Sequence, residues 1–165
     1  MLRRNVENDN PTAVSHLGSC YETGRLGLKP SLKKAARLYQ RAADLGDVLA
    51  MFNLGFAYLQ GRGVKLDKKK AIMYYRMAAD RGFAAAQFNL GFCFYKGDGV
   101  ANNDAEAVRL YKLAADQGHT EAEHNLACMY AIGLGVARNT TEATRLWKCA
   151  AAKGDEGAKT NLARL

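Results

Sequence analysis

The apolar positions of the chain follow a helical spacing, and that spacing is itself repeated along the sequence. Ala50, Leu54 and Tyr58 stand four residues apart, so they form one apolar stripe along a helix. The same stripe returns every thirty-six residues, headed by Ala50, Ala86, Ala122 and Ala158, with Ala13 thirty-seven residues before the first of these. A fixed period of this length is typical of a solenoid, in which each unit buries its stripe against its neighbours.

Each unit contains the signals of two helices. The first helix ends at a glycine-rich loop, "GRGV", "GDGV" or "GLGV", because glycine permits a left-handed turn that other residues resist. The second helix begins at a column of good N-cap residues, Ser31, Asp67, Asn103 and Asn139. Glu106 and Glu142, three residues further on, predict capping boxes. Glycines then end the second helices at Gly46, Gly82, Gly118 and Gly154.

These elements predict an all-α protein, an α-solenoid of antiparallel helix pairs wound as a right-handed superhelix. One domain spanning 1–165 is expected, with four full repeats at about 13–49, 50–85, 86–121 and 122–157 and a partial fifth at 158–165. The corresponding helix count is nine. Gly55 stands beside the apolar stripe, where the lack of a side chain would let a neighbouring helix approach closely.

Composition narrows the class of protein without changing this picture. A hydrophobic fraction of 48% allows a packed core, and the sequence has no apolar run long enough to span a bilayer and no secretory signal. We therefore expect a cytoplasmic protein with no membrane association. The four cysteines form no CxxC pair and match no zinc spacing, so we expect four free thiols and no metal site.

The run "NLGFAYLQGRGVKLDKKKAIMYYRMAADRG", repeated in phase along the chain, resembles the Sel-one-like repeat (SLR) family, a relative of the tetratricopeptide repeat. The match extends from about Asn10 to the C-terminus. The resemblance implies a helical repeat protein that acts as an adaptor or scaffold and binds a peptide or protein partner. It also implies that the first helices line a concave groove.

On that basis the groove is aromatic in its middle and polar at its ends. The candidate partner-binding residues are Phe52, Asn53, Phe56, Phe88, Asn89, Phe92, Tyr95, His124 and Asn125. Packing against the adjacent repeat is the alternative role for the phenylalanines. It carries more weight for Phe56 and Phe92 than for Phe52 and Phe88.

An asparagine recurs at one position of the first helix, although asparagine is a mediocre helix former. The column consists of Asn53, Asn89, Asn125 and Asn161. A side-chain amide both donates and accepts, which suits the main chain of a bound extended peptide. A structural hydrogen bond to a neighbouring helix or loop explains the column equally well, so both interpretations stay open.

A basic outer face is the second candidate surface. The formal net charge is +8, and the second helices carry Arg37, Arg76, Arg109, Lys112, Arg145 and Lys148 at two positions three residues apart. Such a stripe is usually a solvated face, and an acidic protein is the alternative partner. Nucleic acid is a weaker candidate because no aromatic or glycine-rich recognition pattern accompanies the charge.

Catalysis has little support in the sequence. "HTEAEH" lacks the spacing of a zinc-protease motif, and "GRGVKLDKKK" lacks the order of a phosphate-binding loop. We expect no enzyme activity and no cofactor.

Overall fold

The computed structural model describes residues 2–164, with side chains from residue 5 onward, and this part of the chain is helical and contains no strand. The chain divides between Arg81 and Gly82 into two compact units. We refer to them as the N-terminal unit and the C-terminal unit. The all-α repeat fold predicted from the sequence is confirmed.

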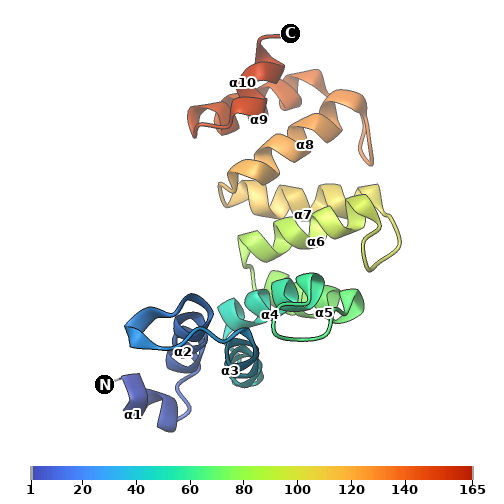
Figure 1. Cartoon of the computed structure of the whole chain (residues 1–165). Coiled ribbons are helices and arrows are strands. Elements are labelled where there is room, and N and C mark those ends of the chain that lie inside the picture. The colour runs from blue at the N-terminus through green and yellow to red at the C-terminus, as the bar shows by residue number, and fades with distance from the viewer. Residues whose placement is uncertain (1, 165) are drawn as a thin grey trace. The chain divides into compact units, whose positions relative to one another are not determined.

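In the N-terminal unit, two hairpins follow a short leading helix (Figure 1). The leading helix is α1 (Leu2–Glu7). The first hairpin consists of α2 (Pro11–Thr23) and α3 (Leu32–Asp44), joined through the short 3₁₀ turn η1 (Arg25–Gly27). The second hairpin consists of α4 (Val48–Gln60) and α5 (Lys68–Ala79).

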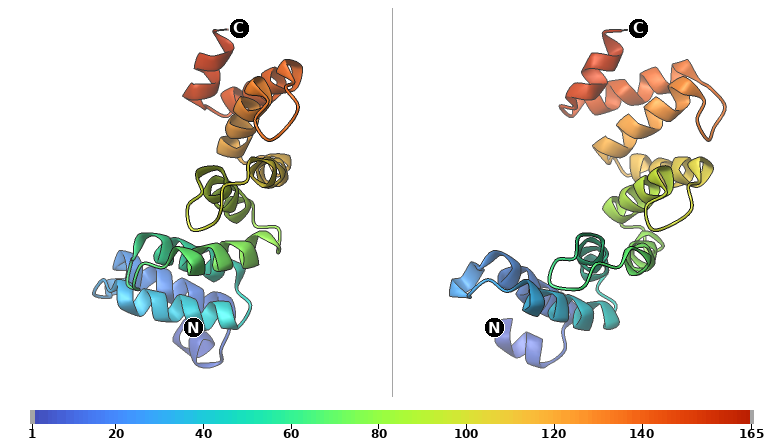
Figure 2. Two further views of the ribbon diagram at one scale, coloured as in Figure 1. Left: turned by 90° about the vertical axis from the view of Figure 1, so that its right-hand side faces the viewer. Right: turned by 45° about the vertical axis from the view of Figure 1, so that its right-hand side comes forward.

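The C-terminal unit has the same organisation, and the turned views show its helices running antiparallel in pairs (Figure 2). Its hairpins are α6 (Ala84–Lys96) with α7 (Asp104–Asp116), and α8 (Thr120–Ile132) with α9 (Thr140–Ala152), followed by α10 (Glu156–Leu162). In both units each first helix begins two residues before the alanine from which the repeats were counted.

The predicted count of nine helices is wrong, because residues 2–164 contain ten α-helices. The additional one is α1, which packs on the first hairpin through Val6, only 9% exposed. The Arg41 guanidinium of α3 donates to the carbonyl oxygen of Val6 at 2.9 Å and to the Asp9 carboxylate at 2.7 Å. These contacts lie more than thirty residues apart in the chain, so the local sequence pattern could not reveal them.

In the first three hairpins a glycine of the first helix packs against a tyrosine of the second. A Cβ atom added to Gly55 would lie 2.5 Å from the Tyr75 ring, and one added to Gly18 would lie 2.8 Å from the Tyr39 ring. Tyr75 is fully buried as a result. The close helix approach expected at Gly55 is therefore confirmed, and the ring of a tyrosine fills the space.

All four predicted N-caps are confirmed, but the capping boxes are only half formed. The Asn103 and Asn139 side chains accept from the backbone N–H groups three residues on, at 3.0 Å. Their own backbone N–H groups donate to the carbonyls of Phe94 and Tyr130. Glu106 instead accepts two hydrogen bonds from the guanidinium of Arg109, which stands one turn further along the same helix.

In two repeats a buried polar residue near the start of the first helix pairs with an exposed residue that follows the second helix. In the third repeat the Gln117 amide donates to Gln87 Oε1 at 2.7 Å. In the fourth repeat the Lys153 ammonium donates to Glu123 Oε1 at 2.6 Å and to the carbonyl of Gly118 at 3.0 Å. Glu123 is only 5% exposed, whereas the side chain of Lys153 is 39% exposed, so the pair joins a buried carboxylate to a surface ammonium.

The glycine loop of one hairpin packs against the start of the preceding second helix. Gly63 has φ +74°, and an added Cβ would overlap the backbone of Leu32 and Lys33 at the start of α3. Gly135 lies in the same way against Asp104 at the start of α7, with φ +68°. These glycines are required both for the left-handed backbone and for the close contact.

Replacing Gly63 with alanine should therefore destabilise the protein more than the same change at Gly46. Gly46 also has a positive φ, but nothing lies within 4 Å of its added Cβ, so Gly46→Ala should cost only the left-handed strain of about 1 kcal/mol. Gly63→Ala should cost about 2 kcal/mol more, because the loop must move off α3. Urea unfolding of both variants measures the difference, and equal losses would contradict the packing role of Gly63.

Candidate functional site

Both units contain a notch between consecutive hairpins, built from the same five repeat positions. In the N-terminal unit these are Glu22, Tyr39, Asn53, Phe56 and Arg62. Two periods later, the C-terminal unit has Tyr95, Tyr111, Asn125, Cys128 and Leu134. The first set of side chains closes the notch with an ionic network, and the second set leaves it open and apolar.

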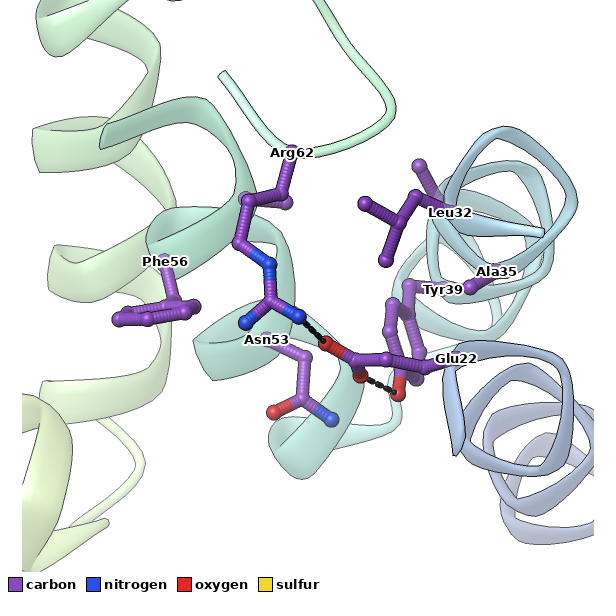
Figure 3. A pocket seen from close by; sticks show the side chains of 9 residues that line it. Glu22, Leu32, Ala35, Tyr39, Asn53, Phe56 and Arg62 are labelled. Atoms are coloured by element: carbon purple, nitrogen blue, oxygen red, sulfur yellow. Dashed lines mark hydrogen bonds and ion pairs between the residues drawn. The ribbon is translucent and has the colours of Figure 1, made fainter. Parts of the chain in front are cut away.

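In the N-terminal unit the notch is closed by an ionic network (Figure 3). The Tyr39 hydroxyl donates to Glu22 Oε2 at 2.8 Å, and Arg62 Nη2 lies 3.1 Å from Glu22 Oε1. The Arg62 guanidinium also stands 5.5 Å from the centre of the Phe56 ring, within cation–π range. The hollow that remains is about 20 Å³, which is room for one water molecule.

The network also fixes the ionisation state of the phenol. Burial raises the pKa of Tyr39, and the hydrogen bond to the Glu22 carboxylate raises it further. The hydroxyl therefore keeps its proton and remains a donor. Two side chains from α2 and α3 are in this way tied to the loop that follows α4.

In the C-terminal unit the notch is open and apolar. Its hollow measures about 290 Å³ over a floor of Tyr111 and Met129, which are both buried. Phe92, Tyr95 and Ile132 stand around it with 43%, 38% and 71% of their surface exposed. At the equivalent positions the N-terminal unit carries the polar or smaller side chains of Ser19, Glu22 and Gln60.

Lys96 is the one charged residue among those that line the open notch. Its ammonium lies 5.2 Å from the centre of the Tyr95 ring and 5.7 Å from that of Phe92. Both distances are within cation–π range, so the two rings hold the charge at the rim. The site thus combines exposed aromatic surface with a single positioned cation.

The floor of the open notch contains a buried hydroxyl without the carboxylate that its counterpart has. Tyr111 is 1% exposed, and among the described residues its hydroxyl has no partner within hydrogen-bond geometry. Burial raises the pKa of Tyr111 to about 12, although the neighbouring amide of Asn125 lowers it in part. Tyr95 occupies the repeat position of Glu22, whose carboxylate accepts the hydrogen bond of Tyr39 in the N-terminal unit.

The four predicted groove phenylalanines fall into a half-buried pair and an exposed pair. Phe52 is half-buried, 5.8 Å from Tyr75 between ring centres, and Phe88 is half-buried between Tyr111 at 5.7 Å and His119 at 4.8 Å. Phe56 and Phe92 are the exposed pair. Phe52 and Phe88 thus pack against a tyrosine of their own hairpin, whereas packing against the adjacent repeat stays a prediction for Phe56 and Phe92.

The remaining predicted groove residues lie partly inside the protein. Asn53 and Asn125 line the two notches, and Asn89 is half-buried on α6. The Asn161 amide donates to Cys128 Sγ at 3.8 Å. All four asparagines are half-buried, and Asn161 contacts a neighbouring side chain, so the structural and the peptide-binding interpretations stay compatible.

His124 is turned toward the last helix. Its Nδ1 lies 2.8 Å from the carboxylate of Asp155, which is the N-cap of α10 and accepts from the Ala158 N–H at 2.6 Å. Burial of Asp155 acts to raise its pKa, but these two hydrogen bonds outweigh burial and lower it.

The residues of the predicted basic face are exposed, but two of them are already paired with acids. Arg109 binds Glu106 and Arg145 binds Glu142, each through two hydrogen bonds. The hydrogen bond from Arg145 lowers the pKa of Glu142. Lys112 and Lys148 are exposed on the same two helices, and Arg37 and Arg76 are exposed in the N-terminal unit.

Several side chains at the notches were not anticipated from the sequence. Arg62, Lys96, Ile132 and Leu134 lie in the glycine loops or at the ends of first helices, outside the groove positions considered. The sequence could have indicated these residues, because they differ in chemistry from the residues at the matching positions of the other repeats.

All four cysteines are free thiols, as predicted.

No helix between residues 2 and 164 combines the length and the apolar content that crossing a membrane requires. In the same stretch, no cluster of three or more His, Cys, Asp or Glu side chains is arranged to hold a metal ion.

A family model described as Sel1 repeat matches four consecutive segments of the chain, residues 11–47, 48–83, 84–119 and 120–155. Sel1 repeat proteins generally serve as scaffolds for protein interactions and are typically not catalysts. No curated protein matches the sequence.

Solved structures are similar over most of the chain. A protective antigen present in uropathogenic Escherichia coli strains, which displays an SLR fold, is 32% identical with a TM-score of 0.94; the match covers 98% of this chain and 34% of that one. A Sel1 repeat protein from Oxalobacter formigenes is 32% identical with a TM-score of 0.89, covering 95% of this chain and 64% of that one. Cysteine-rich protein B of Helicobacter pylori, 23% identical with a TM-score of 0.63 over 79% of this chain and 94% of that one, shares the fold. This chain spans about a third of the first protein and just under two thirds of the second.

The two notches predict opposite responses to removal of the tyrosine hydroxyl. Tyr39→Phe should destabilise the protein by about 1 kcal/mol, because it removes a hydrogen bond to a carboxylate that is only partly solvated. Tyr111→Phe should be neutral or stabilising, because a buried hydroxyl without an acceptor is removed. The free energies of unfolding in urea test this, and a comparable loss for Tyr111→Phe would show that its hydroxyl is hydrogen-bonded.

Asp155 should stabilise α10 in a pH-dependent manner. Asp155→Ala should cost about 1 kcal/mol at pH 7 through loss of the N-cap. Because the folded pKa of Asp155 lies below the unfolded value of about 3.9, its contribution is complete above that value and is lost as the pH falls through the folded pKa. The gap between parent and Asp155→Ala should therefore narrow at pH 3 in urea unfolding. Asp155→Asn, which keeps the cap without the charge, should stay close to the parent at pH 7, and a gap that widens in acid would contradict this role.

Proposed function

The chain belongs to the Sel1 repeat family, whose members generally serve as protein-interaction scaffolds, and we propose that it binds a peptide segment of a protein partner at the open notch of its C-terminal unit. The observation that carries the proposal is the group of Phe92, Tyr95 and Ile132 around a hollow of about 290 Å³. Large apolar side chains that gather at one surface hollow are typical of a binding site.

The shape of the site suits one or two apolar side chains of a partner. Tyr111 and Met129 are buried beneath the hollow, so the floor is fixed by packing before a partner binds. Exposed aromatic side chains lose little conformational freedom on binding and tend to contribute most of the affinity. Lys96, held over the rings of Phe92 and Tyr95, adds a charge at the rim.

The closed notch of the N-terminal unit supports the assignment by contrast. There the Glu22–Arg62 ion pair and the Phe56 ring occupy the space, and only about 20 Å³ is left. The repeat architecture alone therefore does not require an open hollow. The C-terminal notch is open because Tyr95, Cys128 and Leu134 replace the residues that close the N-terminal notch. Binding of a partner is a function that accounts for these replacements.

Peptides selected from a random phage-displayed library on the immobilised full chain should depend on this notch. The double variant Phe92→Ala with Ile132→Ala should bind the selected peptides at least about thirtyfold more weakly, because the loss of even one such anchor typically costs about 2 kcal/mol. Fluorescence anisotropy with synthetic labelled peptides measures the dissociation constants.

Leu113→Ala and Met73→Ala are the matched controls. These residues are 40% and 46% exposed, lie on the second helices α7 and α5, and are not among the residues that line the notch. Both variants should bind like the parent. If the folded double variant binds the peptides as tightly as the parent, or if Leu113→Ala weakens binding equally, the notch is not the site.

A further inference from the structure

We infer that the open notch recognises an acidic side chain of the partner, whose carboxylate takes the position that the Glu22 carboxylate holds in the N-terminal unit. This inference rests on the proposed function, because it names the chemistry of the partner at the same site. It comes from comparing two copies of one notch within one chain.

The N-terminal notch shows how this architecture holds a carboxylate. Glu22 accepts from the hydroxyl of Tyr39 with one oxygen, at 2.8 Å, and pairs with the Arg62 guanidinium through the other, at 3.1 Å. The tyrosine comes from a second helix and the cation from the loop side of the notch (Figure 3). A neutral donor and a cation therefore lie on opposite sides of the bound acid.

The C-terminal notch keeps a donor of each kind but has no acid of its own. Tyr111 replaces Tyr39 at the same repeat position, and its buried hydroxyl has no acceptor within hydrogen-bond geometry among the described residues. Lys96 supplies a cation at the rim in place of Arg62. Tyr95 stands where Glu22 would stand, so the carboxylate must come from outside the chain.

The remaining side chains of the open notch favour an acid flanked by apolar residues. No aspartate or glutamate lines the hollow, so an incoming carboxylate meets no like charge there. Phe92, Ile132 and Leu134 offer apolar surface beside Lys96. We therefore assign the partner as a peptide segment with a glutamate or aspartate between apolar side chains.

A matched pair of small probes tests the carboxylate directly. Solutions of 3-phenylpropionate and of its neutral amide are titrated into the ¹⁵N-labelled full chain, and the backbone shifts of residues 92, 95, 111 and 132 are followed by NMR. The phenyl ring fits the apolar hollow in both probes, so they differ only in the head group, a charged carboxylate in one and a neutral amide in the other. The acid should bind about tenfold more tightly than the amide, which is the contribution of one charge-assisted hydrogen bond.

Two variants assign that preference to the donors. Lys96→Met should bring the affinity for the acid close to that for the amide and leave the amide affinity unchanged. Tyr111→Phe should weaken the acid more than the amide, because a carboxylate accepts a stronger hydrogen bond than an amide carbonyl. Lys112→Met, on the outer surface of α7, and Tyr39→Phe, in the closed notch, should retain the full preference. A loss with Lys112→Met as large as with Lys96→Met would show general charge attraction and overturn the inference.

Capped peptides distinguish an acidic side chain from a chain terminus. One peptide carries a single internal glutamate between phenylalanine and leucine with both ends blocked, and the other carries glutamine there and a free C-terminal carboxylate. Tighter binding of the first supports the inference, and tighter binding of the second overturns it in favour of a terminal carboxylate.

The failure of this inference can be told apart from failure of the proposed function. Acid and amide that shift the notch resonances with equal affinity would refute carboxylate recognition and leave the apolar binding site intact. Absence of shifts with either probe would also refute it. The selected peptides and the double variant Phe92→Ala with Ile132→Ala then judge the proposed function independently.

Discussion

The contact on which the rest of the structure depends is that of a tyrosine ring in the second helix against a glycine in the first. At Gly18 an added Cβ would lie 2.8 Å from Tyr39, and at Gly91 it would lie 3.0 Å from Tyr111. Because the helices approach this closely, the tyrosine ring is buried and its hydroxyl is directed to one fixed place in the hairpin. The notch between hairpins is built around that hydroxyl.

What the notch does is then decided by a few side chains around a constant framework. In the N-terminal unit Glu22 accepts from the hydroxyl of Tyr39, and its ion pair with Arg62, which is partly buried, fills the space. In the C-terminal unit Tyr95 and Leu134 leave the hydroxyl of Tyr111 without an acid and leave the space open. The same repeat architecture thus produces a notch whose polar groups pair with one another in the N-terminal unit, and an exposed apolar hollow in the C-terminal unit.

Several of the cationic side chains form contacts within the protein, and others remain at its surface. Arg41 fastens α1, Arg109 and Arg145 bind glutamates of their own helices, and Lys153 pairs with the buried Glu123. A net charge of +8 therefore overstates the cationic surface available to a partner. Lys96 differs from these cations because it rests on aromatic rings at the edge of the open notch.

The sequence by itself determined the repeat, the helix pairs and their ends. These follow from local physics, since the apolar stripe, the N-caps at Ser31 and Asp67 and the left-handed glycines each act within a few residues. Only the tertiary structure decided which of Phe52, Phe56, Phe88 and Phe92 are exposed, and that α1 is a helix fastened by Arg41. Whether a notch is open or closed also required it, because Glu22, Tyr39 and Arg62 meet from three separate elements. Their pairing depends on distances that a linear pattern does not contain.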